Sequence, residues 1–83
     1  MKLLHFTAEW CGPCQMMKPM IGQVLEEHPE IEYIAIDIDK DRATAMAHGI
    51  MSVPTFILYD GVEVKSRFSG GMPKKNFLDA LGI

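Results

Sequence analysis

Two cysteines three positions apart, Cys11 and Cys14, lie between a short apolar segment and a long amphipathic one. This junction constrains the fold more than any other feature of the chain. The apolar segment, KLLHFT at residues 2–7, predicts a strand, and residues 11–27 predict a helix because their apolar side chains recur at helical spacing. A His-Pro dipeptide then ends the helix. The sequence WCGPC is therefore predicted to join a strand to a helix, with the first cysteine at the helix N-terminus.

Five further elements are predicted downstream of this junction. EYIAIDID is a β-branched run that predicts a strand buried on both faces. The segment DRATAMAH predicts a short helix, capped by Asp39 or Asp41 and closed by Gly49. TFILYD and VEVKSRF predict two antiparallel strands because an Asp-Gly turn signal separates them. KKNFLDAL predicts a closing amphipathic helix.

The resulting order, β-α-β-α-β-β-α, predicts an α/β fold with a four-stranded mixed sheet flanked by three helices. The chain has 83 residues, 48% of them hydrophobic, which is enough for one core and no second domain. We therefore expect a single domain over residues 1–83. The predicted core combines alternating strand positions with helical residues, namely Met17, Ile21, Val24, Phe77 and Leu81.

Charge and hydropathy argue against two classes of partner. Eight basic and eleven acidic side chains give a formal charge of −3, and no basic patch suggests nucleic-acid binding. No window approaches the roughly 18 apolar residues that a membrane span requires. The apolar run at the N-terminus is short and interrupted by His5, so it does not resemble a secretion signal. We expect a cytoplasmic protein, in which a lone cysteine pair is typical of catalysis or metal binding.

A Cys-x-x-Cys pair at a helix start has a clear chemical use. The unpaired N–H groups and partial positive charge of a helix N-terminus favour an anion, so Cys11 is expected to have a lowered pKa and to act as a nucleophile. Cys14, one helical turn further on, lies within reach of the first sulfur. Gly12 tolerates a tight turn, and Pro13 suits the first helical turn. These features predict two-step thiol-disulfide exchange without a bound cofactor.

Two plainer interpretations compete with a redox role. A structural disulfide across so short a loop would constrain the unfolded chain very little. A zinc site would need two further ligands, but His5, His28 and His48 lie on separate predicted elements without ligand spacing. We therefore expect no metal site and favour the reaction over both alternatives.

Three motifs together resemble the thioredoxin family. AEWCGPCQMMKP resembles its active-site segment, SVPT its cis-proline loop, and SGG the glycine that flanks its substrate groove. The motifs occur in the expected order, and the similarity extends over essentially the whole chain. The resemblance implies a thioredoxin-like fold in which Cys11 is the nucleophile and Cys14 the resolving thiol.

The resemblance also implies a substrate-binding rim. Trp10, with Gly12 and Pro13, would form its exposed part. Pro54 would be cis and lie beside the cysteines, with the backbone of Val53 offered to an extended substrate, and Gly70 would allow that partner to approach. Taken singly, Pro54 fits a trans proline that begins a strand, Gly70 a simple turn and Trp10 a core residue. Their joint occurrence around Cys-Gly-Pro-Cys favours the site.

The chain departs from the family pattern at two points. This sequence starts at the strand before the cysteines, without the first strand and helix of a typical thioredoxin, so one sheet edge is expected to be less protected. His5 replaces the buried aspartate that thioredoxins generally place six residues before the first cysteine, and Ala35 replaces its lysine partner. Strand alternation directs His5 toward Cys14, and we hypothesise that neutral His5 is the general base for Cys14. The alternative is a buried histidine bonded to a backbone carbonyl.

The resemblance further implies a monomeric protein-disulfide reductase that carries electrons from NADPH through a flavin-dependent thioredoxin reductase. Its substrates would be disulfide-containing proteins such as ribonucleotide reductase. One alternative is a glutaredoxin-like electron donor to ribonucleotide reductase, although WCGPC and the acidic balance argue against glutathione as the reductant. Another alternative is a non-catalytic subunit of a larger complex.

Overall fold

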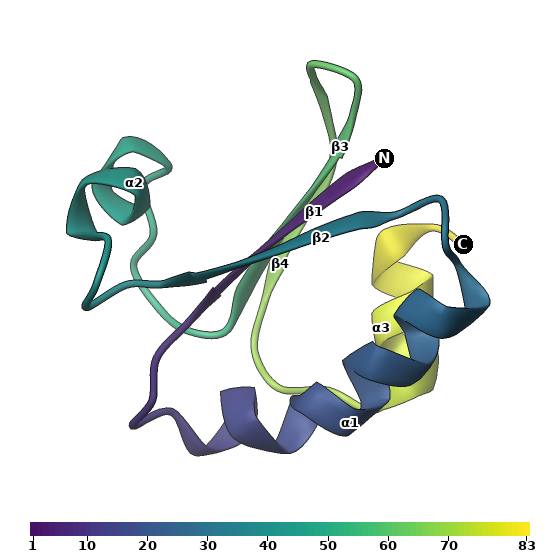
Figure 1. Cartoon of the computed structure of the whole chain (residues 1–83), viewed down its shortest axis with the longest axis horizontal. Helices are drawn as coiled ribbons and strands as arrows, with labels where there is room; N and C mark the ends of the chain where they lie inside the picture. The colour runs from purple at the N-terminus through teal and green to yellow at the C-terminus, as the bar shows by residue number, and fades with distance from the viewer.

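A four-stranded mixed sheet runs through the middle of the computed structural model, which describes residues 1–83 (Figure 1). The elements are β1 (Lys2–Thr7), α1 (Gly12–Glu27), β2 (Glu32–Asp37), α2 (Arg42–Ala47), β3 (Thr55–Asp60), β4 (Glu63–Ser69) and α3 (Lys74–Leu81). The strands lie in the order β2-β1-β3-β4; β1 and β2 are parallel and the other neighbours antiparallel. The predicted element order and mixed sheet are confirmed.

Helices α1 and α3 lie together on one face of the sheet, whereas α2 lies apart from them on the other (Figure 1). The face under α1 and α3 holds a cluster of nine buried apolar residues: Leu3, Met17, Ile21, Val24, Ile31, Phe56, Leu58, Phe77 and Leu81. All five helical residues predicted for the core are among them. This larger core positions α1, and therefore the cysteines at its start.

The opposite face has a smaller core because α2 has only six residues. Its buried cluster contains Leu4, Phe6, Ala45 and Ile57. Asp41 caps α2 by accepting a hydrogen bond from the backbone N–H of Thr44 at 3.2 Å. Of the two predicted caps, Asp41 is therefore correct and Asp39 is not. Gly49 follows the helix with a φ of 65°, the left-handed conformation expected after a helix end.

The prediction that β2 is buried on both faces is wrong. β2 is an edge strand that pairs only with β1, and none of its residues is fully buried. Tyr33, Ile34 and Ile36 are half-buried, whereas Glu32 and Ala35 are exposed. A β-branched run indicates an apolar environment, but the run does not reveal how many strands lie beside it.

The hairpin between β3 and β4 turns one residue later than the Asp-Gly signal suggests. Asp60 pairs with Glu63, so the two-residue loop consists of Gly61 and Val62. Gly61 has a φ of 64° and occupies the first loop position, where a two-residue hairpin of this kind favours glycine. None of the helices is both long enough and apolar enough to cross a membrane.

Candidate active site

The two cysteines form a disulfide at the N-terminus of α1, with their Cα atoms 5.3 Å apart. Cys11 is the N-cap residue, and its sulfur accepts a hydrogen bond from the backbone N–H of Cys14 at 3.2 Å. The first N–H groups of a helix otherwise lack partners and carry partial positive charge. When the disulfide is open, the same geometry stabilises a negative charge on the sulfur of Cys11.

The two cysteines differ in their exposure to solvent. Cys14 is fully buried, and Cys11 is 3% exposed. The residues that follow Cys11, Gly12 and Pro13, are exposed, and Trp10 before it is 68% exposed. Trp10 is therefore a surface residue and not part of the core. An incoming disulfide meets the sulfur of Cys11 first, while Cys14 lies behind it.

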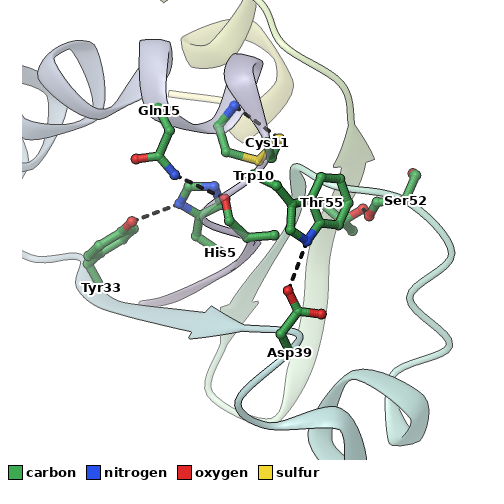
Figure 2. Close-up of a disulfide and its surroundings, with 10 residues drawn as sticks. His5, Trp10, Cys11, Gln15, Tyr33, Asp39, Ser52 and Thr55 are labelled. Atoms are coloured by element: carbon green, nitrogen blue, oxygen red, sulfur yellow. Dashed lines mark hydrogen bonds between the residues drawn. A yellow bond between two sulfur atoms is a disulfide. The ribbon is translucent and has the colours of Figure 1, made fainter.

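Asp39 holds the indole of Trp10 in place. The indole Nε1 donates a hydrogen bond to a carboxylate oxygen of Asp39 at 2.8 Å (Figure 2). Asp39 follows β2, 29 positions further along the chain, and its only predicted role was that of a helix cap. No local spacing links these two residues, so the contact depends on β2 lying parallel to β1.

The loop before β3 lies against the cysteines. The Val53–Pro54 peptide bond is cis, Pro54 is buried, and Val53 packs against the small cluster that contains both cysteines. The backbone N–H and C=O of Val53 form no hydrogen bond within the chain. The hydroxyl of Thr55 donates to the backbone carbonyl of Ser52 at 2.7 Å, which ties the two ends of the loop together.

The glycine pair after β4 lies beside the active-site helix. The N–H of Gly70 donates to the carbonyl of Pro54 at 2.9 Å, and its φ of 99° is a conformation that favours glycine. A Cβ atom on Gly71 would lie 3.0 Å from the Cβ of Pro13. The structure thus brings the WCGPC, SVPT and SGG segments together. Gly70 was predicted from the sequence, whereas the close approach of Gly71 to Pro13 was not.

A groove of about 470 Å³ continues from this point between α1 and the start of α3. Four methionines and one lysine are among the residues that line it: Met16, Met17, Met20, Met72 and Lys74. Methionine side chains adapt to irregular apolar surfaces. The groove extends the exposed surface around Pro13 with an apolar, deformable floor.

His5 is fully buried in β1, and its ring stacks on Phe56 with 4.4 Å between the ring centroids. Its Nδ1 lies 2.7 Å from the hydroxyl oxygen of Tyr33, and its Nε2 has no hydrogen-bond partner (Figure 2). Burial, and secondarily the positive charge of Lys18, lowers the pKa of His5 to about 4. The imidazole is therefore neutral at neutral pH. The predicted alternative of a bond to a backbone carbonyl is wrong, because the partner is the Tyr33 hydroxyl.

His5 lies on the sheet face that α1 covers. Residues at alternate positions of β1 share a face, so His5 lies on the same side as Leu3, which belongs with Met17 to the main core. Cys14 belongs to the same buried face of α1 as Met17. His5 also pairs in register with Ala35 of β2, as the family pattern suggested. The side chain of Ala35 is too short to contact His5. Tyr33, at the diagonal position on β2, contacts it instead.

The chemistry available at this site is two-electron exchange between thiols and disulfides. No group of three or more His, Cys, Asp or Glu side chains gathers where it could hold a metal ion. The site offers a sulfur that a helix N-terminus stabilises as a thiolate, a second sulfur one turn away, and a neutral imidazole on the adjacent face.

Comparison with known proteins gives one consistent result. The family model described as Thioredoxin matches residues 1–82. A thioredoxin from Streptomyces clavuligerus is 41% identical over 76 residues, which cover 92% of this chain and 71% of that protein. A thioredoxin from Staphylococcus epidermidis is 32% identical over 96% of this chain and 78% of its own length. The X-ray structure of Fasciola hepatica thioredoxin superposes with a TM-score of 0.89 at 27% identity, over 98% of this chain and 77% of that one.

Proposed function

The chain belongs to the thioredoxin family of thiol-disulfide oxidoreductases, and from this premise we propose how it reduces a protein disulfide. Cys11, as a thiolate, attacks one sulfur of the substrate disulfide; a new bond joins Cys11 to that sulfur, and the other substrate sulfur leaves as a thiolate. Cys14 then loses its proton and attacks Cys11, which forms the Cys11–Cys14 disulfide and releases the second substrate thiolate. The substrate gains two electrons, and the protein loses two.

The unequal surroundings of the two sulfurs are the observation that supports this order most strongly. The sulfur of Cys11 accepts the backbone N–H of Cys14, and Cys11 is 3% exposed whereas Cys14 is fully buried. Cys14 reacts only after the substrate is attached to Cys11, and it then attacks the sulfur of Cys11. A nucleophile at the rim and a resolving thiol behind it are what the two-step reaction requires.

We assign substrate binding to the surface around Cys11. The free backbone N–H and C=O of Val53 suit an extended segment of the partner, which can pair with them as an added strand does. Pro54 and Gly70 shape the loop that presents Val53. Trp10, with Gly12 and Pro13, borders the site on its exposed side.

His5 is the proposed general base for Cys14. A neutral imidazole has one nitrogen with a lone pair, and Nε2 is the nitrogen of His5 that has no partner. His5 stands six residues before the first cysteine, the sequence position at which thioredoxins generally have a buried aspartate. Replacing His5 with glutamine would remove the base and keep a polar side chain of similar size. We expect slower release of the mixed disulfide between about pH 6 and pH 9, whereas an unchanged pH profile would rule out this role.

Membership of the family supports a proposal for the electron source and the targets. We propose that NADPH reduces the protein through a thioredoxin reductase, and that the protein passes electrons to disulfide-containing proteins such as ribonucleotide reductase. We further propose a cytoplasmic monomer that maintains cellular redox balance. A glutaredoxin-like donor reduced by glutathione is the alternative, and a non-catalytic subunit of a larger complex is a second one.

One pair of assays separates these functions. NADPH consumption is measured with a thioredoxin reductase and a disulfide-bonded protein substrate, and in parallel with glutathione and glutathione reductase. We expect turnover only with the thioredoxin reductase, complete loss in Cys11→Ser, and a trapped mixed disulfide in Cys14→Ser. Turnover only with glutathione would indicate a glutaredoxin. A double Cys→Ser variant that keeps its cellular function would indicate the non-catalytic role.

A further inference from the structure

His5, the base proposed for Cys14, lies where burial makes a positive charge energetically unfavourable. His5 is fully buried, with Phe56 of β3 stacked on one side of its ring. The one charged group that acts on it is Lys18 of α1, whose positive charge opposes protonation, and the facing group on β2 is the uncharged phenol of Tyr33. A buried imidazole without a carboxylate beside it does not hold an imidazolium easily. His5 therefore needs to pass a proton on as it receives one.

Tyr33 is in contact with the nitrogen that would release such a proton. Its hydroxyl oxygen lies 2.7 Å from Nδ1 of His5, while Nε2 has no partner (Figure 2). Tyr33 is half-buried on the edge strand β2, so this side chain connects the closed interior to a partly solvated edge of the sheet. Burial raises the pKa of Tyr33, and its hydroxyl therefore remains protonated at neutral pH.

We propose that Tyr33 is a proton relay and positioning residue for His5, so that His5 takes the proton of Cys14 by changing tautomer instead of becoming charged. This inference rests on the proposed role of His5 as base. Before the reaction, Nδ1–H of His5 donates to the Tyr33 oxygen and Nε2 has the lone pair. A neutral imidazole can take either arrangement, and its partner on one nitrogen decides the state of the other.

Three proton transfers carry the proton of Cys14 to solvent. The Sγ–H proton of Cys14 moves to Nε2 of His5, the Nδ1 proton moves to the Tyr33 oxygen, and the hydroxyl proton of Tyr33 leaves to solvent. His5 and Tyr33 are neutral before and after, and Cys14 attacks Cys11 as a thiolate. When the disulfide is reduced again, the same path runs backward and returns one solvent proton to Cys14.

The structure is that of the disulfide form, in which the relay predicts that the Tyr33 hydroxyl donates to Nδ1. The observed separation of 2.7 Å lets the Tyr33 hydroxyl either donate to Nδ1 or accept from it, as the two states of the relay require. The relay therefore predicts one tautomer in the disulfide form, with the proton on Nε2, and the other tautomer in the dithiol form, with the proton on Nδ1.

Imidazole ¹⁵N chemical shifts measured by NMR on both redox forms test this directly. We expect His5 to change from the Nε2–H tautomer to the Nδ1–H tautomer when the wild-type disulfide is reduced, and we expect Tyr33→Phe to abolish that change. Tyr59→Phe, at the only other tyrosine, is the matched control and should keep it. One and the same tautomer in both wild-type forms would overturn the relay.

A kinetic measurement separates the relay from the base. The reduced protein is mixed with an aromatic disulfide reagent whose thiolate absorbs visible light; the first release reports attack by Cys11 and the second reports attack by Cys14. We expect Tyr33→Phe and His5→Gln to slow the second release about tenfold or more, with the first unchanged and Tyr59→Phe like the wild type. Slowing in His5→Gln alone would refute the relay and keep the base. No slowing in His5→Gln would refute both.

A second variant covers the case in which Tyr33→Phe does not fold. In the Tyr59→Phe background Tyr33 is the only tyrosine, so biosynthetic incorporation of a fluorinated tyrosine alters its hydroxyl alone. Fluorination makes the phenol more acidic while the ring is retained. We expect the rate of the second release at neutral pH to change with the acidity of the phenol while the first release stays the same, and a second release that fluorination leaves unchanged would contradict the relay.

Discussion

The two faces of the sheet differ in how much apolar structure covers them. The face under α1 and α3 has nine buried apolar residues, and it also buries His5. The face under α2 has a cluster of four, and next to it lies an open groove of about 380 Å³ that reaches Leu4 and Val62. The active-site helix is therefore fixed to the better-packed side. The face under α1 and α3 holds both the main core and the proposed base His5. The face under α2 mainly positions that short helix.

This difference can be tested most strongly at two adjacent leucines on β1 that point to opposite faces. Leu3 is fully buried in the larger core, and Leu4 borders the open groove. We expect Leu3→Ala to lower the free energy of unfolding by about 4 kcal/mol, and Leu4→Ala by about 2 kcal/mol, because less new cavity forms beside space that is already open. Urea denaturation measures both values. Equal losses would show that the faces contribute alike.

The pH dependence of stability is the next largest expected effect, and it arises on the face under α1 and α3, where His5 is buried. Because the pKa of His5 falls from 6.5 in the unfolded chain to about 4 in the folded protein, the unfolded chain binds the extra proton between these values. The stabilising contribution is complete above about pH 6.5 and is lost as the pH falls toward 4, by about 3 kcal/mol. Denaturation at several pH values should show this slope, and His5→Gln should flatten it. A slope unchanged by the substitution would contradict the assignment to His5.

The smallest expected effect concerns α2 and the sheet face that it covers. Asp41→Ala removes the side chain that accepts the Thr44 N–H, and the lost hydrogen bonds should let the helix open more often. We expect amide hydrogen exchange in α2 to accelerate about five- to tenfold, with the amides of β1 and α1 unaffected. Asp39→Ala, which removes a nearby carboxylate that is not a cap, is the control. Faster exchange across all elements would indicate that the two faces are not independent.

The sequence predicted best what depends on neighbours along the chain. Helix α1, predicted from Cys11 and observed over Gly12–Glu27 with Cys11 as its N-cap, and the closing helix α3 were predictable because their apolar side chains repeat at helical spacing. The strand order within the hairpin followed from the Asp-Gly signal, although the loop turned one residue later.

Contacts between distant segments were predictable only where a family motif named them. The segments SVPT and SGG were expected beside WCGPC from the resemblance, and they lie there. The bond from Trp10 to Asp39 and the bond from His5 to Tyr33 were not predicted, because both depend on β1 and β2 being neighbours: the first joins the segments that follow the two strands, and the second joins the strands themselves. The edge position of β2 was missed for the same physical reason, since composition records apolarity but not pairing.

The exposed indole beside the disulfide has a practical consequence. Trp10 is the only tryptophan of the chain, it directly precedes Cys11, and Asp39 restrains its ring. A disulfide quenches the light emitted by a nearby indole, and a dithiol does so much less. The intensity of tryptophan fluorescence should therefore rise when the protein is reduced, so that the molecule reports its own oxidation state optically, without any dye or label.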